Sequence, residues 1–169
     1  LKKYYDAHKG DYVSEPTVTL RALLLSAPTQ AVVDAEEDPA RKETLAAQRS
    51  GANVQAGVLR STILAAGTAE GDKAEDFFDA RKKSFIEAVK ANSDDDSKGD
   101  DGLYTGAMTG LRGEATFGKE VADLTKDLKK GDVSEPIANA KGFWLLFAED
   151  AQAGASRSLE DASAEIAET

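Results

Sequence analysis

The order of short apolar segments and long alanine-rich segments limits the fold of this chain more than any single motif. Residues 17–28, TVTLRALLLSAP, predict a first strand closed by Pro28, with alternate apolar residues on one face: Val18, Leu20, Ala22 and Leu24. DVSEPI and GFWLLFAED predict a pair of strands near the other end. Helical segments and a short strand around 103–107 lie between them. This succession predicts an α+β domain with a mostly antiparallel sheet.

The stretch 29–67 is alanine-rich and predicts helices with two breaks. At Asp38-Pro39 the aspartate fits an N-cap and the proline fits the first helical position. We expect a second break at Gly51-Ala52-Asn53. The apolar stripes of these helices are modest, so at least one is expected to pack on its neighbour rather than on a central core.

Three further helices are predicted from capping signals. Asp72, with Glu75 three residues later, is expected to begin a helix whose apolar face repeats at helical spacing: Phe78, Phe85, Ile86 and Val89. Thr116 is expected to cap a helix that ends at Gly131. The acidic end, SLEDASAEIAET, predicts a last short helix capped by Ser158.

Composition excludes several classes of function. A net charge of -10 argues against binding to nucleic acid, whose phosphates would be repelled. The absence of cysteine excludes disulfides and thiolate chemistry, and no motif indicates hydrolase, redox or phosphate chemistry, so no cofactor is expected. No apolar run is long enough for a membrane span, and no membrane contact is expected from this segment. The first residue is not methionine, which suggests a piece of a longer protein.

The acidic segment SDDDSKGDDG allows two interpretations. In a calcium loop starting at Asp94, Asp96 and Gly99 fit the EF-hand pattern. Lys98 stands at position 5, where an oxygen ligand is needed, and Thr105 stands at position 12, where glutamate is needed. A solvated acidic turn is the favoured interpretation, and no metal site is predicted.

Residues 128–150, LKKGDVSEPIANAKGFWLLFAED, resemble the C-terminal signature of parvulin-type peptidyl-prolyl isomerases. In that signature a helix ends at Lys-x-Gly, a Val-Ser-x-Pro turn follows, and a Gly-Tyr/Phe-His strand closes the sheet. VTLRALLL resembles the first strand of the family, and FIEAVKANSDDDSKGDDGLYTG resembles its central helix and turn. The resemblance covers residues 17–27 and 72–150. Residues 1–16 resemble the linker before such domains in exported folding factors of the SurA, PrsA and PpiD type.

The resemblance implies a parvulin-like fold, a four-stranded mostly antiparallel sheet flanked by helices, with extra helices inserted after the first strand. The implied domain covers 17–150, with 1–16 as a preceding linker or helical segment and 151–169 as an acidic tail. Residues 29–71 form the insertion. This insertion either contacts a neighbouring domain or a partner chain, or is neutral decoration.

The resemblance also identifies catalytic positions, and two of them lack the family residue. The paired histidines of the family correspond to Ala22 and Trp144. The family threonine corresponds to Asn139, which can still form hydrogen bonds, and the acidic or cysteine position falls near Asp101 or Gly102. The single histidine, His8, lies in the linker segment and is expected to be exposed.

The family's peptide pocket maps less completely onto this chain. Its phenylalanine floor corresponds to Phe117, whereas its methionine corresponds to Gly113; Met108 could fill part of that space, and Leu111 is a further candidate contact. Trp144 is either a core aromatic or, with Phe117, an aromatic shelf for unfolded peptide, and the two roles overlap. A filled or narrowed pocket is expected.

Three classes of function stay open. The preferred class is a catalytically impaired parvulin-like module in a folding factor that binds unfolded or proline-containing polypeptide or serves as a scaffold. The second is an active isomerase with a non-standard pocket, and the third is a structural or dimerisation module. The resemblance implies a periplasmic or other extracytoplasmic location, as part of a longer protein.

Overall fold

The computed structural model describes residues 17–66, 74–104 and 110–152. The chain divides into two compact units, residues 18–151 and the two terminal segments 1–17 and 152–169. The expected N-terminal and C-terminal helical segments, the Asp72 cap, His8 and Met108 lie outside the described residues. Almost all of the helices and strands described below belong to the first unit.

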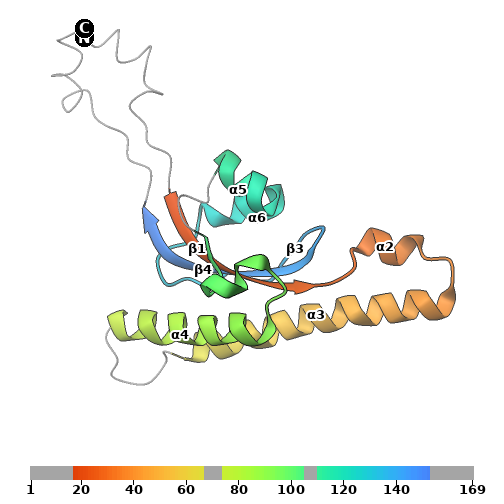
Figure 1. Cartoon of the computed structure of the whole chain (residues 1–169), viewed down its shortest axis with the longest axis horizontal. Helices are drawn as coiled ribbons and strands as arrows, with labels where there is room; N and C mark the ends of the chain where they lie inside the picture. The colour runs from red at the N-terminus through yellow and green to blue at the C-terminus, as the bar shows by residue number, and fades with distance from the viewer. Residues whose placement is uncertain (1–16, 67–73, 105–109, 153–169) are drawn as a thin grey trace, which may run out of the picture. The chain divides into compact units, whose positions relative to one another are not determined.

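The sheet has four strands in the order β2-β1-β4-β3. Their bounds are Thr17–Ser26 for β1, Leu103–Tyr104 for β2, Ile137–Ala138 for β3 and Gly142–Gln152 for β4. β2 pairs antiparallel with β1, and β3 pairs antiparallel with β4. β1 and β4 run side by side in opposite directions at the centre (Figure 1). The predicted α+β class and the antiparallel sheet are therefore confirmed.

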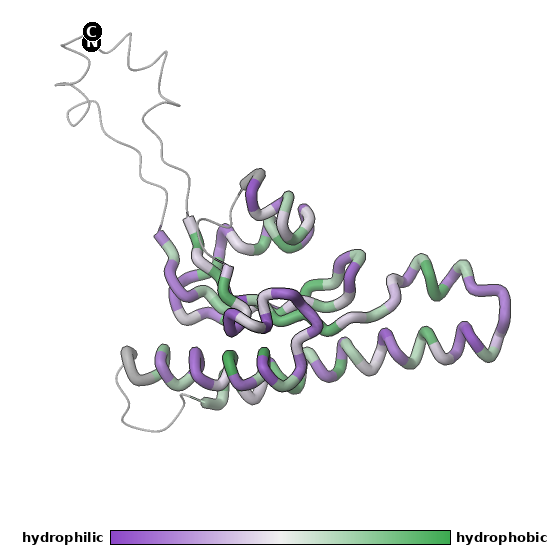
Figure 2. The backbone as a smooth tube through the Cα atoms, viewed as in Figure 1, coloured by the Kyte–Doolittle hydropathy of each residue, from purple (hydrophilic) through white to green (hydrophobic). Residues whose placement is uncertain are grey.

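Each face of the sheet is covered by its own helices (Figure 1). α5 (Gly110–Phe117) and α6 (Lys119–Thr125) lie on one face, and α3 (Pro39–Ala65) and α4 (Ala74–Asn92) lie on the other. Because side chains alternate along a strand, β1 and β4 supply two separate cores. The first contains Ala22, Phe117 and Trp144, and the second contains Leu145, Phe147 and Phe85. Hydrophobic residues accordingly run along both central strands (Figure 2).

Two helices, α2 (Gln30–Ala35) and α3, fill the stretch between β1 and α4. Asp38 caps α3 as predicted, since its Oδ1 accepts hydrogen bonds from the backbone N–H groups of Ala40 and Arg41, and Pro39 is the first helical residue. The buried residues of α3 are Ala56 and Ile63 in its C-terminal half. The N-terminal half projects past the sheet with α2 beside it (Figure 1).

The predicted break at Gly51-Ala52-Asn53 is wrong, because α3 continues through it without interruption. A glycine inside a helix lowers the stability of the helix by about 1 kcal/mol relative to alanine. Gly51 does not have a positive φ, so its backbone does not force a break. Residues that follow the glycine pack in the core that α3 shares with α4 and the sheet, with Ala52 and Ala56 among them. This packing outweighs the unfavourable propensity of one residue.

The predicted helix from Thr116 to Gly131 is also wrong. Thr116 lies inside α5, where its hydroxyl donates to the Arg112 carbonyl at 2.8 Å instead of capping a helix. Gly118 interrupts the helix and separates α5 from α6. Its φ is +88°, a backbone conformation that other residues rarely adopt. α6 then ends at Thr125, well before Gly131.

Two strand boundaries differ from the sequence prediction, and a third is described only in part. β1 ends at Ser26, so Pro28 lies beyond it, and β2 is described only as Leu103–Tyr104 because 105–109 lie outside the described residues. DVSEPI forms one isolated bridge, Val133 to Phe147, followed by the two-residue β3. Pro136 lacks the N–H that a continuous ladder would need at its position.

The acidic segment after α4 covers the edge of β1. Asp94 N–H donates to the Leu24 carbonyl at 2.9 Å, and its Oδ2 accepts from the Ser26 N–H at 2.8 Å. Asp95 caps a short 3₁₀ helix, η2 (Asp96–Asp100). The described residues contain no group of acidic or histidine side chains arranged to hold a metal ion.

Candidate functional site

Trp144 and Ala22 lie on the same face of the sheet, on the two central strands. Both are fully buried, with 0% of their surface exposed. The Phe117 ring, from the end of α5, meets the Trp144 ring edge to face at a centroid distance of 5.3 Å and an interplanar angle of 79°. Phe117 is itself 2% exposed. The pair therefore forms an edge-to-face aromatic contact, which adds to the stabilisation from burial of apolar area.

Tyr104 extends this contact on the other side of Phe117. The two ring centroids lie 4.6 Å apart at an angle of 61°. We call Tyr104, Phe117 and Trp144 the aromatic row. The three residues come from β2, α5 and β4, so the row ties one edge of the sheet through a helix to its centre. The sequence prediction missed Tyr104, whose signal was an aromatic residue in a short strand directly after a glycine turn.

Gly102 positions Tyr104 against β1. Its carbonyl accepts a hydrogen bond from the Ala22 N–H at 2.8 Å, and its φ is +76°. A Cβ on this residue would stand 2.5 Å from the Ala22 carbonyl oxygen, so only glycine allows so close an approach. The close contact brings β2 into register, with Tyr104 opposite Leu20.

Asn139 forms the hydrogen bonds that its position led us to expect. Its Nδ2 donates to the Phe117 carbonyl at 2.8 Å, and its Oδ1 accepts from the Lys141 N–H at 2.8 Å. The first bond holds the end of α5 to the turn between β3 and β4. The side chain of Asn139 therefore fixes the backbone from which the Phe117 ring projects.

A buried acid lies at the far end of the aromatic row. Asp95 is 8% exposed, and its Oδ2 accepts hydrogen bonds from the Tyr104 hydroxyl at 2.7 Å and from the Ser97 N–H at 3.1 Å, as well as from the Ser97 hydroxyl. Burial, followed by the hydrogen bond and the negative charge of Asp95, raises the pKa of Tyr104 well above its ordinary value of 10.0. Tyr104 thus stays a neutral hydrogen-bond donor. The sequence prediction missed Asp95, although aspartate is a favoured N-cap residue.

Asp101 is oriented toward a different set of partners. It adopts a left-handed conformation at φ +58°, its carbonyl accepts from Arg21 Nη1 at 3.0 Å, and its carboxylate pairs with Lys90 of α4 at 3.0 Å. The structure brings Ala22, Trp144, Phe117 and Asn139 together, while the Asp101 carboxylate faces α4. Met108 and the side chain of Leu111 are not among the described parts of the chain.

The indole N–H of Trp144 is buried without a hydrogen-bond partner among the described residues. An unpaired buried donor costs about 1–3 kcal/mol, so Trp144 packs here at some energetic cost. Neither the indole of Trp144 nor the methyl group of Ala22 can act as a general acid or base near neutral pH. At these two positions the site can offer apolar contact and one N–H donor, but no acid or base.

Comparison with known proteins identifies the family of the chain and similar folds. The family described as PPIC-type PPIASE domain matches residues 56–164. No curated protein sequence matches the chain.

Two solved structures share the fold. One comes from work on the virulence factor PEB4 and the periplasmic protein Cj1289, two SurA-like chaperones of Campylobacter jejuni; its TM-score is 0.58 and its identity 19%, over 98% of this chain and 50% of that one. The other is the peptidylprolyl isomerase PrsA of Bacillus cereus, with a TM-score of 0.50 and 15% identity, over 99% of this chain and 45% of that one. The chain therefore spans about half the length of either structure.

Proposed function

The chain belongs to the PPIC-type peptidyl-prolyl cis-trans isomerase family, and we propose that its parvulin-like domain is catalytically impaired and binds polypeptide, or serves as a scaffold, within a protein-folding factor. The complete burial of Trp144 against Phe117 is the observation that carries this proposal. It concerns the position where, in the family, a histidine is expected.

Rotation about a prolyl amide crosses a barrier of about 18–20 kcal/mol without breaking a bond. An enzyme lowers this barrier by binding the twisted amide more tightly than either planar form, which needs an open pocket and oriented hydrogen-bond donors. Here the aromatic row fills the space over the sheet with its own rings. A proline ring could reach Phe117 only by displacing part of that packing.

The setting of the domain is part of the same proposal. Both similar structures are named as chaperones or isomerases, and one of the two C. jejuni proteins is named as periplasmic. We extend this to the present chain as a location outside the cytoplasm and a role in handling unfolded or proline-containing polypeptide. No described helix combines the length and the apolarity of a membrane span.

The test is a protease-coupled or NMR exchange assay of cis/trans interconversion on a panel of Xaa-Pro peptides. We expect no acceleration above buffer, with the same result for Phe117→Ala. Because Phe117→Ala removes a core ring, Asn139→Ala is tested beside it as a milder change at the same site. Acceleration by the wild type that either variant abolishes would overturn the proposed impairment.

Binding is measured separately through Trp144, the only tryptophan in the chain. Its emission should be that of a buried indole, and an unfolded polypeptide that engages the aromatic row should change its intensity or wavelength. The control is the same titration with Leu124→Ala, which changes an exposed side chain of α6 (49% exposed) and should leave the response of the Trp144 emission unchanged. Emission that no polypeptide alters would contradict peptide binding at the aromatic row.

A second candidate function is an active isomerase with a non-standard pocket. The hydrogen bonds from Asn139 to Phe117 and from Tyr104 to Asp95 favour it, because a polar network still surrounds the site. In that case Tyr104→Phe, which keeps the ring and removes the hydroxyl, should lower the rate of isomerisation about 10- to 100-fold.

The third candidate is a dimerisation module. It is favoured by the exposed valines Val54 and Val58, one turn apart on α3, which are 63% and 58% exposed. Sedimentation of the wild type beside a variant carrying serine at both valines tests it: a dimer that the variant loses would favour this function.

A further inference from the structure

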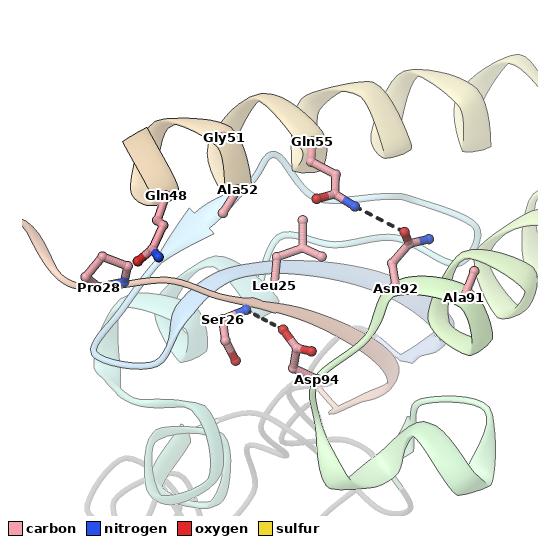
Figure 3. Close-up of a pocket in the computed structure, with 10 residues that line it drawn as sticks. All are labelled: Leu25, Ser26, Pro28, Gln48, Gly51, Ala52, Gln55, Ala91, Asn92 and Asp94. Carbon is pink, nitrogen blue, oxygen red and sulfur yellow. Dashed lines mark hydrogen bonds between the residues drawn. The ribbon is translucent and has the colours of Figure 1, made fainter. Parts of the chain in front are cut away.

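The face of the sheet opposite the aromatic row carries a hollow of about 730 Å³ (Figure 3). It lies where α3 passes the end of α4 and the chain that follows β1. We call it the α3–α4 groove. Its α3 wall is formed by four residues at helical spacing, Gln48, Gly51, Ala52 and Gln55.

Side-chain amides provide most of the hydrogen-bonding groups of the α3–α4 groove. Gln55 Nε2 donates to Asn92 Oδ1 at 3.1 Å, a bond that joins α3 to the end of α4 across the groove (Figure 3). Asn92 Nδ2 in turn donates to the Ala88 carbonyl at 3.0 Å. A carboxamide carries both donors and an acceptor, which is also what a peptide group presents. The lining therefore matches the hydrogen-bonding pattern of a polypeptide backbone.

The length of the α3–α4 groove sets the size of an occupant. Gln48 and Gln55 are seven positions apart on α3, which corresponds to about 10 Å along a helix axis. An extended chain rises about 3.3 Å per residue, so this length accommodates about three residues. The small side chain of Ala52 and the absence of one at Gly51 leave room for a backbone between the glutamines.

Charge selects among peptide sequences. Asp94 is the one ionisable residue in the lining of the α3–α4 groove, and its side chain is exposed while Oδ2 accepts from the Ser26 N–H. The chain as a whole carries a net charge of -10. A positively charged side chain is therefore favoured and a negatively charged one is disfavoured.

We propose that the α3–α4 groove binds an extended polypeptide segment of about three residues that carries a lysine or arginine, held by the amides of Gln48, Gln55 and Asn92 with its charge beside Asp94. This site extends the peptide-binding half of the proposed function to a second surface. It does not depend on the aromatic row, because the two lie on opposite faces of the sheet.

The probe is the peptide acetyl-Ala-Lys-Ala-amide, titrated to millimolar concentration into the isotope-labelled full chain and followed by NMR. We expect shifts in the backbone signals of Gly51 and Ala52 and in the side-chain amide signals of Gln48, Gln55 and Asn92. The same peptide with glutamate in place of lysine should bind about 2- to 5-fold more weakly, as expected for one partly exposed ion pair.

A matched pair of glycines on α3 provides the blocking variant and its control. A Cβ added at Gly51 or at Gly57 would meet nothing within 4 Å, but only Gly51 lines the α3–α4 groove. Gly51→Phe should abolish the shifts, while Gly57→Phe should leave them unchanged. Asp94→Asn is the second test, since its amide oxygen can still accept from Ser26; it should remove the preference for lysine over glutamate.

Three results would overturn the proposal. The first is the absence of NMR shifts in the groove, and the second is shifts that Gly51→Phe and Gly57→Phe reduce equally. The third is groove signals that change when the protein is diluted without peptide, which would mean that a second copy of the chain occupies the groove. The indole signal of Trp144 separates this test from that of the proposed function. A peptide that shifts only the indole signal would contradict binding in the α3–α4 groove and support binding at the aromatic row. A peptide that shifts only the groove signals would support the groove and contradict binding at the aromatic row.

Discussion

The two faces of the sheet share the central strands β1 and β4 but differ in how they are covered. On the α5/α6 face, aromatic rings close over Ala22 and Trp144, and the residues there are among the most buried in the described part of the chain. On the α3/α4 face, a larger aliphatic and aromatic core lies beside an open, amide-lined groove. The same two strands thus support a closed aromatic contact on one face, while α3 and α4 leave a concave surface on the other.

The largest effect should follow from opening the closed face. Trp144→Ala removes a fully buried ring and should lower the free energy of unfolding by about 3–5 kcal/mol. Trp144→Phe should lower it by less than about 1.5 kcal/mol, because the lost volume is partly offset by removal of the unpaired indole N–H. Denaturant unfolding followed by circular dichroism measures both. Equal losses for the two variants would mean that the indole N–H has a partner.

Two glycines, Gly102 beside β1 and Gly51 in α3, should respond in opposite directions. Gly102→Ala places a Cβ 2.5 Å from the Ala22 carbonyl oxygen at a positive φ, so we expect a loss of about 2–3 kcal/mol in the free energy of unfolding. Gly51→Ala meets nothing within 4 Å and lies inside a helix, so it should raise that free energy by about 1 kcal/mol. Thermal or denaturant melts of the two single variants check the sign as well as the size. A neutral Gly102→Ala would contradict the close approach of the chain to Ala22.

An ion-pair cluster on the α3/α4 face predicts a dependence on pH. Glu149 of β4 pairs with Arg21 of β1 and with Lys82 of α4. Burial by itself would raise the pKa of Glu149, but the hydrogen bonds from Lys82 and Arg21 outweigh it and lower the pKa below its ordinary value of 4.5. The unfolded state therefore binds the proton first as pH falls.

Glu149 accordingly contributes stability that is complete above about pH 4.5 and is lost as pH falls through the lower pKa of the folded state. Glu149→Gln should lower the free energy of unfolding by about 1–2 kcal/mol at neutral pH. The difference between wild type and variant should shrink in acid, as measured by urea midpoints across pH. Glu135→Gln is the control, since Glu135 pairs with Arg60 while its side chain is 74% exposed. A difference that is constant with pH would show that Glu149 acts through its shape rather than its charge.

Local signals predicted the parts of the fold that depend on neighbouring residues alone. The Asp38-Pro39 cap is an example, because an aspartate side chain and the first free N–H groups of a helix lie within a few residues of each other. The break expected at Gly51 failed for the opposite reason. A weak local preference was overridden by contacts with α4 and the sheet, which are distant in sequence.

The candidate site divides in the same way. Strand alternation predicts one face for Leu20, Ala22 and Leu24, and the resemblance to parvulins identified Ala22 and Trp144 as a pair of corresponding positions. It did not identify Tyr104 as a neighbour of Phe117, nor Asp95 as the acceptor of the hydrogen bond from the Tyr104 hydroxyl. Both contacts depend on how the folded chain places Tyr104. Asn139 was expected to form hydrogen bonds, but its acceptor, the Phe117 carbonyl, lies 22 positions away.

The sequence by itself determined the class of fold, the family and the residues that stand at positions 22 and 144, because these depend on residue identity and periodicity. The tertiary structure alone decided that Trp144 is fully buried, that Gly102 brings Tyr104 against the sheet, and that α3 passes α4 so as to leave a groove. The physical reason is that these features depend on the rotamers and close packing of segments far apart in the chain, which no local pattern encodes.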